Sequence, residues 1–203
     1  MHFSLNDEQL MLQKMMRAFA DEVVAPGAIE RDKTKAFPIE IFNQLAEMGI
    51  MGLPFPEQYG GAGADTISFV IATEELSRVC ASTGITYSAH ISLGGAPLHL
   101  FGTEQQKEKY LTPICTGESF GAFGLTEPNA GSDAGGTETQ AVLKDGQFTI
   151  NGSKVFITNA SYAKHLALTA ITNVKDGKKE ISAIIVPTDA AGFTIKSEYE
   201  KMG

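Results

Sequence analysis

The spacing of apolar residues changes near Gly117, and this change constrains the fold more than any other feature. Before it, apolar residues recur at the three- and four-residue intervals of helices; after it, they fall in short runs separated by turn residues. One pair of runs is joined by Asp145-Gly146, a favoured type I′ hairpin turn, and Asp176-Gly177 lies between another pair. The sequence therefore predicts an α+β chain, with an all-helical domain over residues 1–117 and an antiparallel β domain, barrel-like or sandwich-like, over residues 118–203. The boundary between them is expected at Thr116–Ser119.

The expected strands share apolar or alternating character and are bounded by turn residues. They are Phe120–Thr126, Thr139–Lys144, Gln147–Thr158, His165–Thr172, Glu180–Pro187 and Phe193–Lys196.

Local signals fix where several helices begin and end. Asn6 followed by Gln9 matches a capping box, in which each residue bonds the backbone of the other, and the same pattern recurs at Thr103. Pro38 suits the first turn of a second helix, and Gly49 is expected to stop it.

Composition excludes several classes of protein. The chain has 203 residues, of which 43% are hydrophobic and 20% charged, as in ordinary globular domains. No apolar run approaches the length needed to span a bilayer, and the N-terminus has neither a signal peptide nor a transit peptide pattern. A net charge of −8 argues against a nucleic-acid partner. We therefore expect a cytoplasmic or organellar matrix protein that is not secreted and binds neither membrane nor nucleic acid.

The cysteines and histidines show no metal-ligand spacing, so no metal site is predicted. Cys80 and Cys115 are interpreted as reduced core thiols. His90 and His99 have no partner constellation in the sequence, and each is interpreted as a partly buried histidine with a local hydrogen bond.

Two polar stretches of the second half could bind a ligand. Residues 123–136 read FGLTEPNAGSDAGG, and residues 147–160 read QFTINGSKVFITNA. The first is a run of small and polar residues whose backbone N–H groups a hydrogen-bond-accepting ligand could approach closely. From the pattern alone, this loop is either such a site or a simple connection between strands.

The ordered pair LTEPNAGSD and NGSKVFITNA resembles the flavin-contacting motifs of the acyl-CoA dehydrogenase family. This resemblance implies bound FAD and the α,β-dehydrogenation of a short-chain acyl-CoA thioester. In that reaction a base removes the α-proton and the flavin accepts the β-hydride. It further implies a role in fatty acid β-oxidation, electron transfer to an electron-transferring flavoprotein, and a homotetramer or homodimer for the full-length protein.

The resemblance also assigns individual residues. Leu125 and Thr126 would donate hydrogen bonds near flavin N1 and the C2 carbonyl, Thr158 would bond N5, and Phe156 would pack on the ring face. Ser132 would approach the pyrophosphate and also the acyl-CoA. The implied cofactor contacts are Phe123, Gly124, Leu125, Thr126, Gly131, Ser132, Phe156, Ile157 and Thr158. The implied acyl-CoA contacts are Ser132, Ala89, Leu93 and Ala96.

No catalytic base is assigned to this chain. Glu127 is the obvious candidate, but a glutamate before a proline at a strand end is interpreted as a structural hydrogen-bond acceptor. In the family the catalytic carboxylate lies in a C-terminal helical domain, which these 203 residues do not include. This piece alone is therefore expected to be inactive. Two alternatives stay open: an acyl-CoA oxidase-like enzyme, or a non-catalytic fragment that binds acyl-CoA or flavin.

Overall fold

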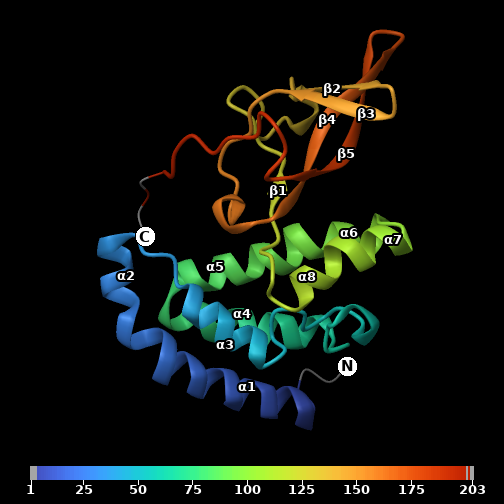
Figure 1. The fold of residues 1–203 in the computed structure, drawn as a ribbon. Coiled ribbons are helices and arrows are strands. Elements are labelled where there is room, and N and C mark those ends of the chain that lie inside the picture. The colour runs from blue at the N-terminus through green and yellow to red at the C-terminus, as the bar shows by residue number, and fades with distance from the viewer. Residues whose placement is uncertain (1–3, 200, 202–203) are drawn as a thin grey trace. The chain divides into compact units, whose positions relative to one another are not determined.

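The computed structural model describes residues 4–199 and 201. The chain divides into two compact units, one ending at Ser119 and the other comprising Phe120–Tyr199 (Figure 1). We call them the helical unit and the β unit and describe each by itself. The order of a helical part followed by a sheet part confirms the predicted α+β class.

The helical unit contains eight α-helices joined by short turns among its described residues. Their bounds are α1 Asp7–Phe19, α2 Ala28–Thr34, α3 Ile39–Glu47, α4 Thr66–Val79, α5 Ala81–Ala89, α6 Ala96–Phe101, α7 Glu104–Gln106 and α8 Thr112–Cys115. Tighter or wider helical turns lie at Ala20–Val24, Ala25–Gly27, Glu57–Tyr59, His90–Gly95 and Lys107–Leu111.

The predicted capping signals are present. The Asn6 side chain accepts a hydrogen bond from the Gln9 N–H at 2.8 Å, and the Gln9 side chain accepts from the Asn6 N–H at 3.1 Å. Thr103 forms the same reciprocal box at the start of α7. α3 ends just before Gly49, whose φ of +73° suits a glycine at a helix stop. These local sequences therefore set helix ends as expected.

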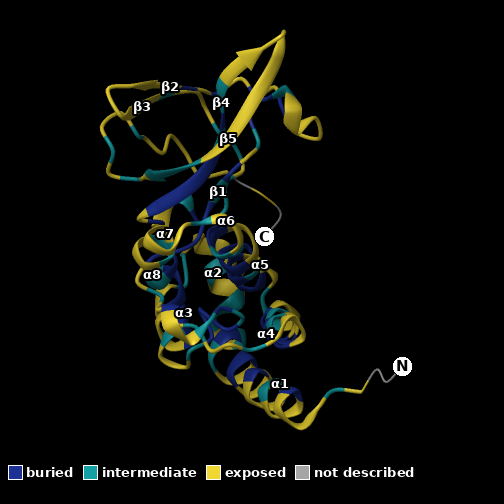
Figure 2. Cartoon of the chain, turned by 90° about the vertical axis from the view of Figure 1, so that its right-hand side faces the viewer, coloured by how far each residue is buried: buried dark blue, intermediate teal, exposed yellow. Residues whose placement is uncertain are grey.

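The core of the helical unit is formed by one face of each long helix (Figure 2). Met16, Phe42, Leu45 and Leu76 are almost completely buried. Tyr87 is also fully buried, and its hydroxyl donates to the Ile50 carbonyl at 3.1 Å, so its polar atom is satisfied. No described helix is both long and apolar enough to cross a membrane.

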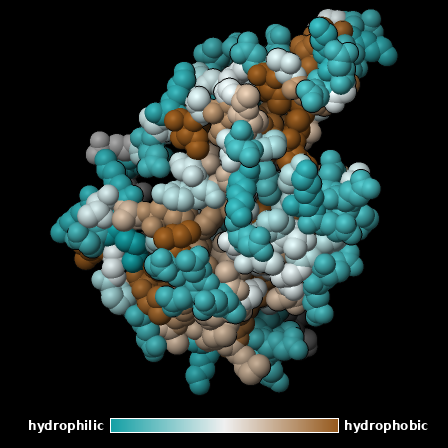
Figure 3. Space-filling view, viewed as in Figure 1, coloured by the Kyte–Doolittle hydropathy of each residue, from teal (hydrophilic) through white to brown (hydrophobic). Residues whose placement is uncertain are grey.

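Some large apolar side chains remain on the surface, as the brown areas of Figure 3 show. In the helical unit Phe101 is 84% exposed, although it belongs to an otherwise apolar segment. Phe42, by contrast, is 2% exposed. The two residues therefore allow the effect of burial on stability to be compared for the same side chain.

The two histidines differ in their surroundings. His90 is completely buried rather than partly buried, and its Nε2 lies 3.0 Å from the carbonyl of Met51, which is 39 positions away in the sequence and not a local partner. His99 packs against Phe55 with ring centroids 5.7 Å apart, but its buried Nδ1 has no partner among the described residues. The local hydrogen bond predicted for His99 is therefore not seen at that nitrogen.

Burial of His90 predicts a pH-dependent stability. Burial lowers its pKa to about 4, outweighing hydrogen bonds to the Met51 and Ile114 backbone that favour the charged form. Because the unfolded chain then binds more protons between pH 4 and 6.5, the free energy of unfolding should rise over that range by about 3 kcal/mol and level off above it. Urea denaturation followed by circular dichroism at several pH values measures this rise. In a His90→Gln variant the rise in the free energy of unfolding should shrink by that amount. An unchanged dependence of this free energy on pH would show that His90 is not its source.

The β unit contains one five-stranded mixed sheet among its described residues. Its strands are β1 Phe123–Gly124, β2 Gln140–Lys144, β3 Gln147–Asn151, β4 His165–Lys175 and β5 Lys178–Pro187. The order is β1-β4-β2-β3, and β5 also pairs with β4. Pairs β2/β3 and β4/β5 are antiparallel, but β1/β4 and β2/β4 are parallel. The prediction of a wholly antiparallel domain is corrected accordingly, because only the hairpin pairings follow from neighbouring segments.

Both hairpin turns have the expected geometry. Asp145 and Gly146 have φ values of +52° and +78°, and Asp176 and Gly177 have +50° and +74°. Two positive φ values in succession match the type I′ turn. These two short sequences thus fix two of the four strand pairings.

Three expected strands differ from the structure. The run Phe120–Thr126 pairs only at β1, and β3 ends at Asn151 rather than at Thr158. Residues 193–196 form no strand. Phe193 instead packs on the sheet core, whose buried members are Ala122, Ala141, Ala163, Leu166, Leu168 and Ala170. Its apolar character therefore reflects burial rather than strand pairing.

Candidate functional site

The two motif stretches lie side by side in the β unit. β1 pairs with β4 through Phe123 and Gly124, and the chain then continues through Leu125 and Thr126. The Val155 N–H donates to the Thr126 carbonyl at 2.9 Å. Residues separated by about thirty positions in the sequence are thereby joined at the end of β1.

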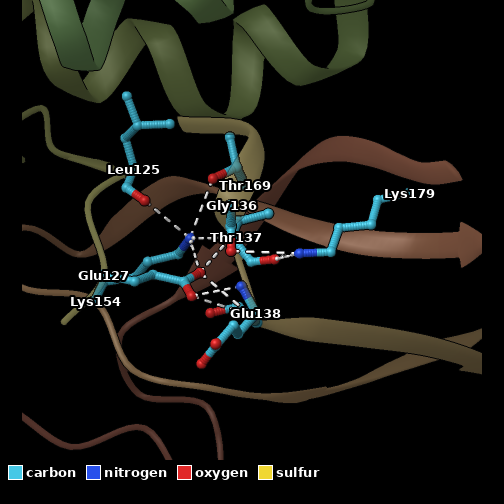
Figure 4. Close-up of polar contacts among 9 residues, drawn as sticks. Leu125, Glu127, Gly136, Thr137, Glu138, Lys154, Thr169 and Lys179 are labelled. Carbon is cyan, nitrogen blue, oxygen red and sulfur yellow. Dashed lines mark hydrogen bonds and ion pairs between the residues drawn. The ribbon is translucent and has the colours of Figure 1, made fainter. Parts of the chain in front are cut away.

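Glu127 is the centre of a buried polar cluster (Figure 4). Its carboxylate accepts hydrogen bonds from the Glu138 N–H at 2.6 Å, the Thr139 N–H at 3.2 Å and the Thr137 hydroxyl. It also pairs with the Lys154 ammonium at 2.6 Å. The interpretation of Glu127 as a structural acceptor is confirmed, because these donors hold the loop after β1 against the start of β2.

The charge of Glu127 is stabilised strongly by these neighbours. Burial acts to raise the pKa of Glu127, but the hydrogen bonds from Lys154, Thr137, Thr139 and the Glu138 backbone outweigh it and hold that pKa well below its usual range. Glu127 is therefore an ionised carboxylate at neutral pH, and its lone pairs are already occupied. Such a group is a poor proton acceptor.

Lys154 connects both motifs and β4. Its ammonium lies within hydrogen-bond distance of four oxygens: the Leu125 carbonyl at 3.1 Å, Glu127 at 2.6 Å, the Thr137 hydroxyl at 3.3 Å and the Thr169 hydroxyl at 3.1 Å (Figure 4). The side chain is only 9% exposed. Sequence reasoning missed this residue, although a lone lysine between Ser153 and an apolar run was a signal that it could be paired inside the fold.

Phe156 is presented in a strained backbone conformation. Its φ is +59°, which is rare for a bulky residue, and its side chain is 60% exposed. The ring contacts Tyr199, with centroids 4.8 Å apart. Asn159 also has a positive φ, and its side-chain amide donates to the Gly121 carbonyl at 3.1 Å, which anchors this turn to the chain before β1.

Several polar groups at the site are not used within the protein. The Thr126 and Thr158 hydroxyls are half-buried and have no hydrogen-bond partner among the described residues. Leu125 is partly exposed beside them in sequence, and Ile157 packs into the sheet core. Unpartnered hydroxyls on two adjoining segments, one of which also carries an exposed aromatic ring, fit a flat heteroaromatic ligand that has hydrogen-bond acceptors at its edge. The residues present are thus compatible with the isoalloxazine ring of FAD.

The glycine-rich loop is open where a ligand contact is predicted. A Cβ placed on Gly131 would meet no atom within 4 Å, and Ser132 is exposed. At Gly124 a Cβ would instead lie 3.0 Å from the Leu168 Cβ, so strand packing leaves little room for a side chain there. Packing within the sheet therefore explains why a glycine occupies position 124. It does not explain the glycine at position 131.

The predicted acyl-chain residues belong to the helical unit and are not part of this cluster. Ala89 is the last residue of α5 and is buried, Leu93 is 47% exposed in the turn His90–Gly95, and Ala96 begins α6. Their role stays a prediction. Within the described residues no group of three or more histidine, cysteine or acidic side chains could hold a metal ion.

Comparison with protein families decides the identity of the chain. Residues 6–118 match the acyl-CoA dehydrogenase N-terminal domain, and residues 122–203 match the acyl-CoA dehydrogenase middle domain. The chain belongs to the acyl-CoA dehydrogenase family. It is 53% identical over 204 residues to a probable acyl-CoA dehydrogenase, YngJ, of Bacillus subtilis, covering 100% of this chain and 54% of that protein.

Solved structures agree with the family assignment. Butyryl-CoA dehydrogenase from Megasphaera elsdenii superposes with a TM-score of 0.94 at 42% identity, covering 100% of this chain and 54% of that one. An acyl-CoA dehydrogenase from Bacillus anthracis in complex with FAD gives a TM-score of 0.90 at 37% identity, covering 98% of this chain and 34% of that one. The chain thus spans about half the length of the curated relatives it matches.

Proposed function

We propose that the full-length protein is an FAD-dependent dehydrogenase that introduces an α,β double bond into a short-chain acyl-CoA thioester. The observation that carries this proposal is the meeting of Thr126 with the Lys154–Thr158 segment, which brings together two half-buried threonines whose hydroxyls have no hydrogen-bond partner among the described residues and one exposed aromatic ring. Further support comes from the butyryl-CoA and FAD relatives named above.

Each residue of the site has a chemical role in this proposal. Bound FAD would supply the acceptor for the β-hydride. The Leu125 N–H, together with the Thr126 N–H and hydroxyl, would stabilise the negative charge that develops near N1 and the C2 carbonyl, and Thr158 would donate to N5. Phe156 would restrain the ring by packing on its face. Phe123, Gly124 and Ile157 would shape the backbone around these contacts.

The remaining contacts are proposed for the substrate and the cofactor's phosphates. Gly131 and Ser132 would approach the pyrophosphate, and Ser132 would also contact the acyl-CoA, since both residues are exposed and free of internal packing demands. Ala89, Leu93 and Ala96 would line the acyl chain. The catalytic base would be supplied by residues outside this chain, because Glu127 is fully engaged in structural hydrogen bonds.

The biological setting follows from the same proposal. Electrons would pass to an electron-transferring flavoprotein, in fatty acid β-oxidation, from a full-length enzyme that is a homotetramer or homodimer in the cytoplasm or an organellar matrix. The piece of 203 residues by itself would not turn over, because it lacks the base.

Thr158 provides the test of the site. In the FAD-loaded full-length enzyme, Thr158→Val should slow single-turnover flavin reduction by about ten- to 150-fold, the value of one hydrogen bond to a charge-developing centre, about 1.5–3 kcal/mol. Anaerobic stopped-flow absorbance measures this rate. Thr149→Val, at an exposed position of β3, serves as the control and should leave the rate unchanged. Equal rates for both variants would remove Thr158 from the site.

A further inference from the structure

We propose that Lys154 is a positioning residue that raises the reduction potential of the bound flavin by polarising the Leu125–Thr126 peptide group. This inference rests on the function proposed above, in which the Thr126 N–H is directed at the flavin. It assigns Lys154 a role in the electronics of the site, beyond holding two segments together.

Lys154 acts on a single peptide group. The carbonyl of Leu125 and the N–H of Thr126 belong to the same amide, and the Lys154 ammonium donates to that carbonyl at 3.1 Å. A charged donor on the oxygen of an amide draws electron density toward the oxygen and makes its N–H a stronger donor. The Thr126 N–H would therefore bind a developing negative charge more tightly than an unassisted amide.

The surroundings of Lys154 preserve this effect. Its side chain is 9% exposed and that of Glu127 is 4% exposed, so water screens the interaction little. Glu127 anchors the ammonium at 2.6 Å, and the other oxygens within reach are the Thr137 and Thr169 hydroxyls. Because an ammonium has three protons for these four acceptors, the Leu125 carbonyl shares its donor with the two threonines.

The orientation of the Thr126 backbone is fixed by hydrogen bonds to the peptide groups before and after it. The preceding carbonyl is held by Lys154, and the carbonyl of Thr126 accepts from the Val155 N–H at 2.9 Å. The N–H of that same Thr126–Glu127 peptide is held as well, since the Glu127 N–H donates to the Ala130 carbonyl at 2.9 Å. The Thr126 N–H is consequently preorganised, which is the condition for electrostatic stabilisation of a developing charge.

A purely structural clamp makes a different prediction from an electronic role, and paired substitution separates them. Lys154→Met alone leaves Glu127 buried without its partner, so any loss could reflect misfolding. The double variant Lys154→Met with Glu127→Gln removes both charges and keeps the side-chain sizes. If Lys154 polarises the peptide, the double variant should regain the stability to urea that Lys154→Met loses. Its preference for reduced over oxidised flavin should nevertheless be about three- to tenfold weaker than that of the unmodified enzyme. For a two-electron couple this is a midpoint potential about 14–30 mV lower.

Thr169→Val supplies a test of opposite sign that does not disturb the ion pair. Valine keeps the shape of threonine and suits β4, but it removes one oxygen that competes for the Lys154 protons. The Leu125 carbonyl should then receive more of the donor, and the preference for reduced flavin should rise by about twofold, or about 9 mV.

The measurements are spectroelectrochemical titrations of the FAD-loaded full-length enzyme. A double variant with the unmodified potential, or a Thr169→Val variant with an unchanged or lower potential, would overturn the proposal and leave Lys154 as a clamp. Lys154→Arg, which keeps a charged donor, should retain most of the potential. If the unmodified full-length protein binds no flavin, it is the proposed function that fails, and this outcome is distinct from the others.

Discussion

Replacing Glu127 with alanine is expected to lower the free energy of unfolding of the β unit by about 3–5 kcal/mol. The reason is that Lys154, only 9% exposed, would be left without the carboxylate that pairs with it at 2.6 Å. The Thr137 hydroxyl and the Glu138 and Thr139 N–H groups would lose their acceptor as well. Urea denaturation followed by far-ultraviolet circular dichroism measures the change.

Glu138→Ala is the matched control, because this neighbouring glutamate is exposed and, among the described residues, its carboxylate makes only a long 3.4 Å contact with Asn129. It should change stability by no more than about 0.5 kcal/mol. The stabilisation by Glu127 should also depend on pH with a defined sign. Because its folded pKa is lowered, its contribution is present above the ordinary glutamate pKa and is lost as pH falls toward the folded value. Similar losses for the two variants would show that the cluster contributes nothing specific.

The second large effect is expected at Phe42, in α3. Phe42→Ala should cost about 3–5 kcal/mol, because the ring is 2% exposed and its removal leaves a cavity in the helical core. It would also remove the stacking with Phe37, whose ring centroid lies 5.7 Å away. The same denaturation experiment applies.

Phe101→Ala removes an identical side chain from a position that is 84% exposed. It should alter stability by less than about 0.5 kcal/mol. If both phenylalanine variants lost comparable stability, the burial of Phe42 would not be the source of its effect.

Local sequence predicted the parts of the fold that depend on local bonds. The capping boxes at Asn6 and Thr103 are closed by residues three positions away, and the turns at Asp145-Gly146 and Asp176-Gly177 need two adjacent residues with positive φ. In each case the deciding atoms lie within one turn of chain, so residue type alone carries the information.

Longer-range features were not predictable in the same way. The parallel pairing of β2 with β4 joins Gln140 to Ile171 across an intervening hairpin, and nothing in either segment specifies it. The run after Asn151 has strand-like apolar character, but Phe156 and Asn159 adopt positive φ values. Such strain persists only where surrounding contacts impose it, so propensity gave the wrong structure there.

In the candidate site, too, local features were predicted from the sequence and long-range contacts were not. Glu127 was interpreted correctly as a structural acceptor from its place before Pro128 at a strand end. Its lysine partner was not anticipated, because Lys154 is 27 positions away and reaches Glu127 only once the two motifs are adjacent. The family resemblance indicated the ligand, and the structure adds the contacts that align the two segments.

The most direct test of the central claim is an anaerobic titration of the purified full-length protein, followed by its visible spectrum. We expect flavin absorbance in the protein as isolated, and bleaching of that absorbance by butyryl-CoA in preference to octanoyl-CoA or isovaleryl-CoA. A full-length protein that contains no flavin and takes up no added FAD would contradict the account.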